Sequence, residues 1–265
     1  MRVVQIVAPA IEADLASDRL WQAGATAVEE IDLGDAMVGL RSVLASDDAV
    51  SMARIGLVPP DWSVEMLDLD DAPAETWRAF VAPVELAGGV VVRPAWLDPV
   101  GDGRLEVEIE PAGSFGLGDH PTTRLTAEAV VRSVRPGMNV LDVGCGSGVL
   151  GILAARLGAT RVVAIDVSEA AVEATSANAK RNGVTLSVSS DPLSEIDGRF
   201  DLVLANVLAP TIVGLADDLV RVTAGTLVVS GVLADAHGHV IEALRPLTPY
   251  RTEVLEAWAA VEFSR

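Results

Sequence analysis

Residues 139–151 read NVLDVGCGSGVLG, and this stretch decides the fold of the chain. Its first five residues are typical of a buried strand that ends at a turn cluster. Gly144, Gly146 and Gly148 then allow the backbone to approach a ligand closely. A helix-forming run follows and stops at Gly158. A ligand over this turn meets backbone N–H groups and the positive end of a helix, so the stretch predicts a binding site.

Two kinds of ligand fit this turn. Gly146, Gly148 and Gly151 match G-x-G-x-x-G, with Asp166 at the distance of a ribose-binding acid, as in dinucleotide-binding proteins. Asp142 extends the pattern to D-x-G-x-G-x-G, and a carboxylate there repels phosphate but attracts a cation. The longer pattern resembles motif I of class I methyltransferases, which use S-adenosylmethionine. A tight turn without any ligand is the third interpretation.

Composition limits the functional classes. The chain has 265 residues, half of them hydrophobic, which is enough for one large domain or two modest ones. No apolar run of about 18 residues is present, so no membrane span is expected. The first residues turn acidic too early for a signal peptide. Cys145 is the one cysteine and cannot form an internal disulfide, so we expect a cytoplasmic protein.

The net charge of −19 is concentrated in the first part of the chain. Residues 1–112 hold 21 acidic residues and 7 arginines, a net charge of −14, whereas residues 113–265 carry −5. A nucleic-acid binder needs a basic face, so no direct binding of nucleic acid is expected. The acidic first part either steers a basic protein partner or keeps an alanine-rich chain soluble.

The first 70 residues predict a small α+β domain. Strand patterns cover residues 2–8, 25–31, 36–44 and 62–69, and helix patterns cover 11–23 and 46–56. This β-α-β-β-α-β order is that of a ferredoxin-like domain. A short helix bracketed by prolines and two β-like runs, 89–93 and 104–110, then predict a linker helix and a β-hairpin. The expected organisation is residues 1–70, a linker of residues 71–112, and a catalytic domain of residues 113–265.

The last domain alternates strands and helices. Strand patterns cover residues 139–143, 161–165, 184–188, 200–205, 225–230, 250–257 and 258–264. Helix patterns cover 124–134, capped by Thr122 or Thr123, and then 149–157, 169–181, 210–222 and 234–244. The alternation predicts an α/β fold, a doubly wound, seven-stranded, mostly parallel Rossmann-like sheet. Ligands bind beyond the carboxyl ends of such strands.

Three polar residues lie at or near those strand ends. Asp166 can accept hydrogen bonds from ribose hydroxyls or cap a helix. Asp142 can hold an ammonium group or bond to the N–H groups of its own turn. Asn206 can offer an acceptor oxygen to an amine, which aligns its lone pair for methylation, or it can order a loop. No metal site is expected.

A more specific resemblance rests on three motifs. They are residues 115–123, FGLGDHPTT, residues 206–209, NVLA, and residues 230–233, SGVL. Together they resemble the ribosomal protein L11 methyltransferase family. The resemblance implies a ferredoxin-like domain that binds the substrate protein, a flexible linker, and methylation of lysine side chains and the N-terminal amine of L11. Leu117 and Asp119 depart from the family pattern, which usually has Thr at the first position and Thr or His at the second.

We therefore expect an S-adenosylmethionine-dependent protein N-methyltransferase whose partner is ribosomal protein L11. The alternatives are a methyltransferase for another protein or a small molecule, a nicotinamide-dependent oxidoreductase, and a binding module without catalysis. Asn206 is the expected catalytic residue. The cofactor-binding residues suggested by the motif or by the resemblance are Thr123, Asp142, Gly144, Gly146, Asp166 and Asn206.

Overall fold

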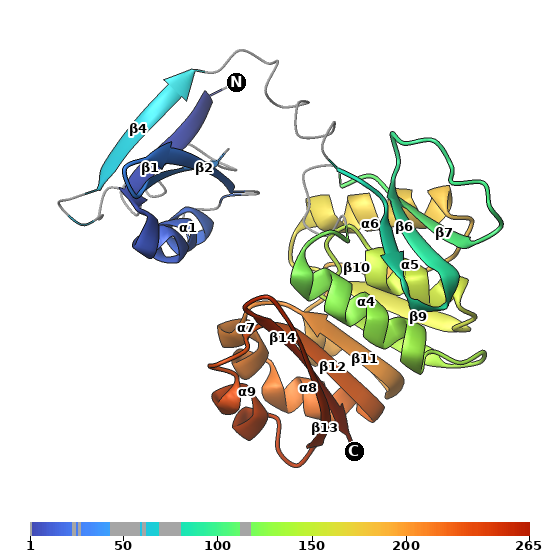
Figure 1. Ribbon diagram of the computed structural model, residues 1–265. Helices are drawn as coiled ribbons and strands as arrows, with labels where there is room; N and C mark the ends of the chain where they lie inside the picture. Colours follow the sequence, from blue (N-terminus) through green and yellow to red (C-terminus); the bar gives the residue numbers. More distant parts are fainter. Residues whose placement is uncertain are drawn as a thin grey trace. The chain divides into compact units, whose positions relative to one another are not determined.

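The computed structural model describes residues 2–22, 25, 28–42, 59, 62–68, 81–111 and 118–265 (Figure 1). The chain forms two compact units, Met1–Val81 and Ala82–Arg265. The three-part organisation with boundaries at residues 70 and 112 stays a prediction. The expected helix over residues 46–56 and the linker helix lie outside the described residues.

The first unit is built on a four-stranded antiparallel sheet in the order β2-β3-β1-β4. Its elements are β1 (Arg2–Pro9), η1 (Ala10–Glu12), α1 (Ala13–Gln22), β2 (Glu29–Gly34), β3 (Met37–Ser42) and β4 (Ser63–Asp68). This strand order is that of a ferredoxin-like domain, as predicted. Ile6, Leu20 and Leu40 are fully or almost fully buried between sheet and helix.

Strand β2 begins four residues later than its pattern suggested, and the turn to β3 falls at Asp35 and Ala36, both with positive φ. The pattern placed Glu29 and Glu30 inside the strand and the turn at residues 32–35, whereas the strand continues to Gly34. The acidic residues are tolerated inside it because β2 is an edge strand with a largely exposed surface.

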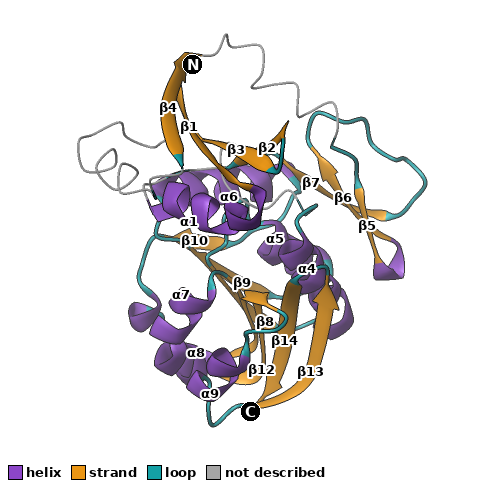
Figure 2. Cartoon of the chain, turned by 60° about the vertical axis from the view of Figure 1, so that its left-hand side comes forward, coloured by secondary structure: helices purple, strands orange, loops and turns teal. Residues whose placement is uncertain are grey.

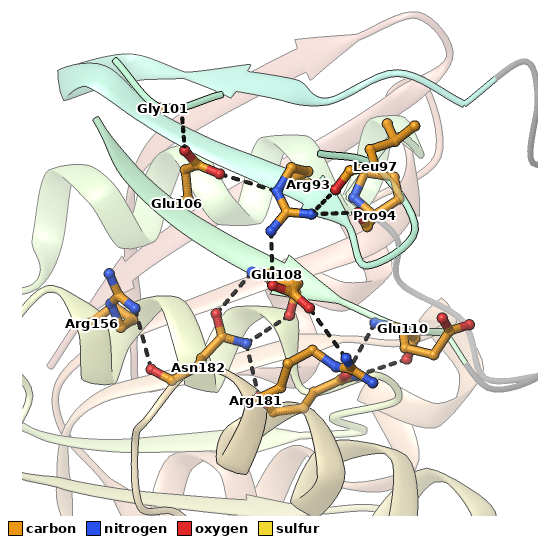
Figure 3. Close-up of polar contacts among 11 residues, drawn as sticks. Arg93, Pro94, Leu97, Gly101, Glu106, Glu108, Glu110, Arg156, Arg181 and Asn182 are labelled. Atoms are coloured by element: carbon orange, nitrogen blue, oxygen red, sulfur yellow. Dashed lines mark hydrogen bonds and ion pairs between the residues drawn. The ribbon is translucent and has the colours of Figure 1, made fainter. Parts of the chain in front are cut away.

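The second unit begins with a three-stranded sheet of β5 (Val84–Leu86), β6 (Val90–Pro94) and β7 (Leu105–Ile109). The runs 89–93 and 104–110 were expected to form a hairpin, and this was wrong, because β6 and β7 pair in parallel. The antiparallel pair is β5 and β6. Arg93 explains the crossover between β6 and β7. Its buried guanidinium donates to the carbonyl oxygens of Pro94 and Leu97 and so fixes the start of the connection (Figure 3).

The main sheet of this unit has seven strands in the order β10-β9-β8-β11-β12-β14-β13. Its strands are β8 (Asn139–Val143), β9 (Arg161–Ile165), β10 (Ser187–Ser189), β11 (Phe200–Asn206), β12 (Thr223–Leu233), β13 (Thr248–Leu255) and β14 (Trp258–Ser264). The first five strands in this order pair in parallel, and β14 runs antiparallel to both of its neighbours. The expected doubly wound, mostly parallel fold is confirmed.

Helices cover both faces of the main sheet (Figure 2). They are α4 (Pro121–Ser133), α5 (Val149–Arg156), α6 (Glu169–Arg181), α7 (Ala209–Gly214), α8 (Ala216–Val222) and α9 (Gly238–Ala243). Alternate residues of β8 face opposite sides, as strand geometry requires. Leu141 and Val143 pack in the core that contains residues of α7, α8 and α9, whereas Val140 packs in the core that contains residues of α4 and α5.

Three helix boundaries differ from the sequence pattern. The helix expected over residues 210–222 is two helices that meet at Leu215. Helix α9 starts four residues later than expected, because residues 234–237 form a turn after β12. Helix α4 starts at Pro121 and is capped by His120, not by Thr122 or Thr123. None of the helices in the described part of the chain is long and apolar enough to cross a membrane.

Candidate active site

Three parallel strands end at one level of the main sheet. Val143 of β8 pairs in register with Ile165 of β9 and with Ala205 of β11. Neighbouring strands lie about 4.8 Å apart. The next residue of each strand therefore reaches the same rim, and these residues are Gly144, Asp166 and Asn206. The sequence pattern had placed Asp166 and Asn206 at such strand ends, and this register brings both to one rim.

Asp166 is tied to the glycine turn across this rim. Its Oδ2 accepts a hydrogen bond from the Gly146 N–H at 3.0 Å, and its Oδ1 accepts from the Ser168 N–H at 3.0 Å. Ser168 itself caps helix α6, as its sequence position predicted. Both oxygens of Asp166 keep a second lone pair, and the residue is partly exposed. The carboxylate is therefore held in place and can still accept hydrogen bonds from a ligand's hydroxyl groups.

Asp142 lies one layer below the rim, inside strand β8, and its side chain is fully buried. Its Oδ2 accepts from the Gly151 N–H at 2.9 Å, and a Cβ at Gly151 would lie 3.2 Å from the same oxygen. The other oxygen, Oδ1, has no hydrogen-bond partner. Burial raises the pKa of Asp142 to about 7, the Gly151 N–H opposes this, and the negative charge of Asp166 adds to it.

An unpartnered buried carboxylate oxygen is costly, because burying a polar group without a hydrogen bond is unfavourable. Among the described residues, the buried side-chain polar atoms in this condition are Asp142 Oδ1 and His237 Nδ1. The oxygen of Asp142 suits a donor that carries positive charge, since such a donor stabilises the ionised form. The Gly151 N–H, in the first turn of α5, is already taken by the other oxygen of this carboxylate.

Asn206 and Thr123 meet at the other side of the glycine turn. Asn206 ends strand β11 and its Nδ2 donates to Thr123 Oγ1 at 3.3 Å, while Thr123 is buried in the first turn of α4. The carbonyl oxygen of the Asn206 amide then points away from Thr123. This pair brings together two residues that lie 83 positions apart in the sequence.

His120 supports this arrangement from the start of α4. Its Nδ1 accepts from the Thr122 N–H at 3.3 Å, and its ring packs edge-on against Trp258 with centroids 5.5 Å apart. Burial lowers the pKa of His120, and the charges of Asp119 and Glu256 oppose the shift. A neutral ring fits the acceptor role of Nδ1, so His120 orders the start of α4.

The glycine turn is close-packed and specific in shape. Gly144, Gly146 and Gly148 all have positive φ, which favours glycine. A Cβ at Gly144 would overlap Val207 Cγ1, and a Cβ at Gly148 would lie 2.7 Å from Thr175 Cγ2. Cys145 is buried in this turn, and burial raises the pKa of its thiol to about 12, so the thiol stays protonated and fills space.

Sequence reasoning did not single out the residues of helix α6 that hold this turn. Thr175 Oγ1 donates to the Gly146 carbonyl oxygen at 3.0 Å, and Asn178 Nδ2 donates to the Ser147 carbonyl oxygen at 2.9 Å. Both are buried. The available signal was their spacing, because Thr175, Asn178 and Asn182 place polar side chains on one face of a helix that packs against protein. Among the described residues, no group of histidine, cysteine and acidic side chains is arranged to hold a metal ion.

The family model for ribosomal protein L11 methyltransferases matches residues 4–265. The chain belongs to this family. A ribosomal protein L11 methyltransferase of Geobacter metallireducens is 42% identical over 173 residues, which are 64% of this chain and 57% of that protein. One of Geotalea daltonii is 37% identical over 226 residues, 79% of this chain and 70% of that protein.

A solved structure agrees with this membership. The ribosomal protein L11 methylase of Lactobacillus delbrueckii subsp. bulgaricus has a TM-score of 0.64 and 28% identity, and the match covers 70% of this chain and 98% of that one. The chain spans 57% and 58% of the length of two curated family members that it matches. The family resemblance inferred from the three sequence motifs is confirmed.

Proposed function

We propose that this chain transfers methyl groups from S-adenosylmethionine to lysine side-chain and N-terminal amino groups of ribosomal protein L11. The observation that carries the proposal is the unpartnered, buried Oδ1 of Asp142 beneath a glycine turn whose rim holds Asp166 and Asn206. Family membership and the relatives named as L11 methyltransferases support it.

The residues of the site fit S-adenosylmethionine. Asp142 Oδ1 suits the ammonium group of the cofactor's amino-acid part, directly or through a water molecule. Asp166 suits the two ribose hydroxyls, because the Gly146 and Ser168 N–H groups fix its orientation. Gly144 and Thr123 stand at the same rim and complete the set of residues that would surround the bound molecule. When bound, S-adenosylmethionine supplies an electrophilic methyl group on a sulfonium.

The chain's own contribution to the reaction is positioning. Thr123 holds the Nδ2 side of the Asn206 amide, and Asn206 Oδ1 can then accept an N–H of the substrate amine. This contact orients the amine lone pair without adding a proton to it. A lysine amine has a reference pKa of about 10.4 and must lose a proton first, and burial in the site favours the neutral amine. Good positioning can supply about 7–11 kcal/mol of rate enhancement.

The acidic first unit is the proposed recognition surface for the basic substrate. Met1–Val81 holds 15 acidic residues and 5 arginines, a net charge of −10, which favours encounter with a lysine-rich protein and disfavours nucleic acid. Because the proposed substrate is a ribosomal protein, we also propose that the chain acts in the cytoplasm.

A two-part experiment tests the proposal. Added S-adenosylhomocysteine should raise the melting temperature of the chain, NAD should not, and Asp166→Ala should abolish the rise. Purified unmethylated L11 with S-adenosylmethionine should then gain mass in steps of one methyl group, mapped to lysines and the N-terminus by mass spectrometry. A shift with NAD alone would point to an oxidoreductase. Cofactor binding without any mass gain on L11 would point to a different substrate.

A further inference from the structure

Among the strands that the structure describes, none covers the second edge of β7. Its other edge pairs with β6, and in a strand the N–H and C=O groups of alternate residues point to the same side. Glu108 and Glu110 therefore direct their backbone groups away from β6. Buried backbone groups need partners, and here the partners come from helix α6 and the residue that follows it.

Two asparagine side chains act as a substitute strand along this edge. Asn182 Oδ1 accepts from the Glu108 N–H at 2.8 Å, and Asn182 Nδ2 donates to the Glu108 carbonyl oxygen at 2.6 Å (Figure 3). Asn178 repeats the pattern two residues along, with the Glu110 N–H at 3.0 Å and the Glu110 carbonyl oxygen at 2.8 Å. Four positions on a helix and two on a strand each span about 6 Å, so the two spacings match.

Ion pairs and a further hydrogen bond also hold this edge of β7. The Glu108 carboxylate lies 2.8 Å from Arg93 Nη2 and 3.2 Å from Arg181 Nη1, and Arg156 donates to the Asn182 carbonyl oxygen at 3.2 Å (Figure 3). These contacts dock β7, and Asn182 Nδ2 also donates to the Asn178 carbonyl oxygen at 2.8 Å, so the amide of Asn182 serves β7 and the end of α6.

Asn178 differs from Asn182 in the partner of its second Nδ2 hydrogen bond. Its Nδ2 also donates to the Ser147 carbonyl oxygen at 2.9 Å, inside the glycine turn. Thr175, one turn earlier on α6, holds the neighbouring Gly146 carbonyl oxygen at 3.0 Å. A trans peptide unit is planar with N–H opposite C=O. Fixing these two carbonyls therefore fixes the two peptide planes that follow the Gly146 N–H, the group that holds Asp166.

We propose that Asn178 is a positioning residue of the cofactor site, joining the glycine turn to the end of β7 through one amide. This inference rests on the proposed function, because it assigns the turn to S-adenosylmethionine. Asn178 acts through the turn and does not touch the reacting atoms. Its loss is expected to weaken cofactor binding, whereas the loss of Asn182 weakens the docking of β7 and the end of α6.

The test compares Asn178→Ala with Asn182→Ala in the full chain. Each variant removes one buried amide that pairs with the β7 backbone, so both should lower the melting temperature by similar amounts. Calorimetry with S-adenosylhomocysteine should give a dissociation constant about tenfold higher for Asn178→Ala, and within twofold of the unaltered chain for Asn182→Ala. The KM for S-adenosylmethionine should follow the same split.

Asn178→Asp and Asn182→Asp give a second matched pair in case the alanine variants fail to fold. Aspartate keeps the volume and the acceptor for the β7 N–H but, when ionised at pH 8, offers no donor to Ser147 or to the strand. The same tenfold difference is expected. Equal affinities within either pair would overturn the inference. Failure of the unaltered chain to bind S-adenosylhomocysteine would instead contradict the proposed function.

Discussion

At the scale of single residues, the candidate site depends on what each carboxylate is bonded to. Asp166 has both oxygens engaged by backbone N–H groups and lies at the partly exposed rim, whereas Asp142 is buried with one oxygen unpartnered. Both residues could be singled out from the sequence, because they stand near the carboxyl ends of predicted parallel strands and such ends lie along one edge of a sheet. The depth of Asp142 was not predictable, since only two residues along the strand separate the rim from the buried layer.

Asp142 makes cofactor affinity depend on pH. Its pKa is raised to about 7 by burial, and a bound ammonium group favours the ionised form. Binding is therefore coupled to loss of a proton, and affinity for S-adenosylhomocysteine should fall about tenfold for each pH unit below about 7. Calorimetry between pH 5.5 and 8.5 checks this. Asp142→Asn, which has no such proton to lose, should bind weakly at every pH, and a flat profile for the unaltered chain would contradict the assignment.

Substitutions of Asn206 and of Thr123 are expected to lower kcat by different amounts. Asn206→Ala removes the acceptor that orients the amine, and misplacement of a reacting group can cost about 100-fold in rate. Thr123→Val removes only the oxygen that holds the amide, so we expect a smaller loss of about tenfold in kcat. Steady-state kinetics on L11 measure both. A Thr123→Val enzyme as slow as Asn206→Ala would show that Thr123 does more than hold the amide.

At the scale of elements, the strand–turn–helix unit around Gly144 was predictable, and several pairings were not. The strand patterns located β8, β9 and β11 because apolar runs were bounded by turn residues. The parallel pairing of β6 and β7 brings buried Arg93 to Glu106 and Glu108, contacts that the strand patterns do not reveal. From the sequence, Asn178 and Asn182 are indistinguishable from solvent-exposed polar residues of a helix. Their role is visible only in the structure, where β7 packs against them.

Gly144 tests the packing of this unit. An alanine there has φ of +73°, which costs about 1–2 kcal/mol, and its Cβ overlaps Val207 Cγ1. We expect Gly144→Ala to lower the free energy of unfolding by about 3 kcal/mol, with the overlap adding to the backbone cost. In Gly144→Ala/Val207→Ala the overlap is gone, so the double variant should be more stable than the sum of the single effects. Urea denaturation of all four proteins measures this, and strict additivity would show that the two residues do not interfere.

At the scale of the whole molecule, the two units carry different parts of the proposed activity. Every candidate site residue lies in Ala82–Arg265, whereas Met1–Val81, less than a third of the chain, carries a net charge of −10 out of −19. Composition predicted this asymmetry, and the β-α-β-β-α-β pattern predicted the sheet order of the first unit. The division of the chain at residue 81 depends on contacts that composition does not reveal.

Removal of the first unit should separate binding from protein methylation. A chain that begins at Ala82 keeps all residues of the candidate site, so its dissociation constant for S-adenosylhomocysteine should stay within twofold of the full chain. Methylation of L11 should fall at least about 100-fold, because the acidic recognition surface is lost and substrate encounter slows with it. Mass spectrometry of L11 after incubation with each protein measures the loss, and full activity of the shorter chain would show that the first unit does not select the substrate.

The unpartnered oxygen of Asp142 also bears on how this protein can be engineered. Substitutions that give this oxygen a hydrogen-bond partner or remove it should raise the free energy of unfolding of the cofactor-free protein, because they relieve an unfavourable burial. Screens that select variants for heat resistance alone would therefore tend to collect changes at this position, and the selected proteins would have lost the very group that recognises the methyl donor.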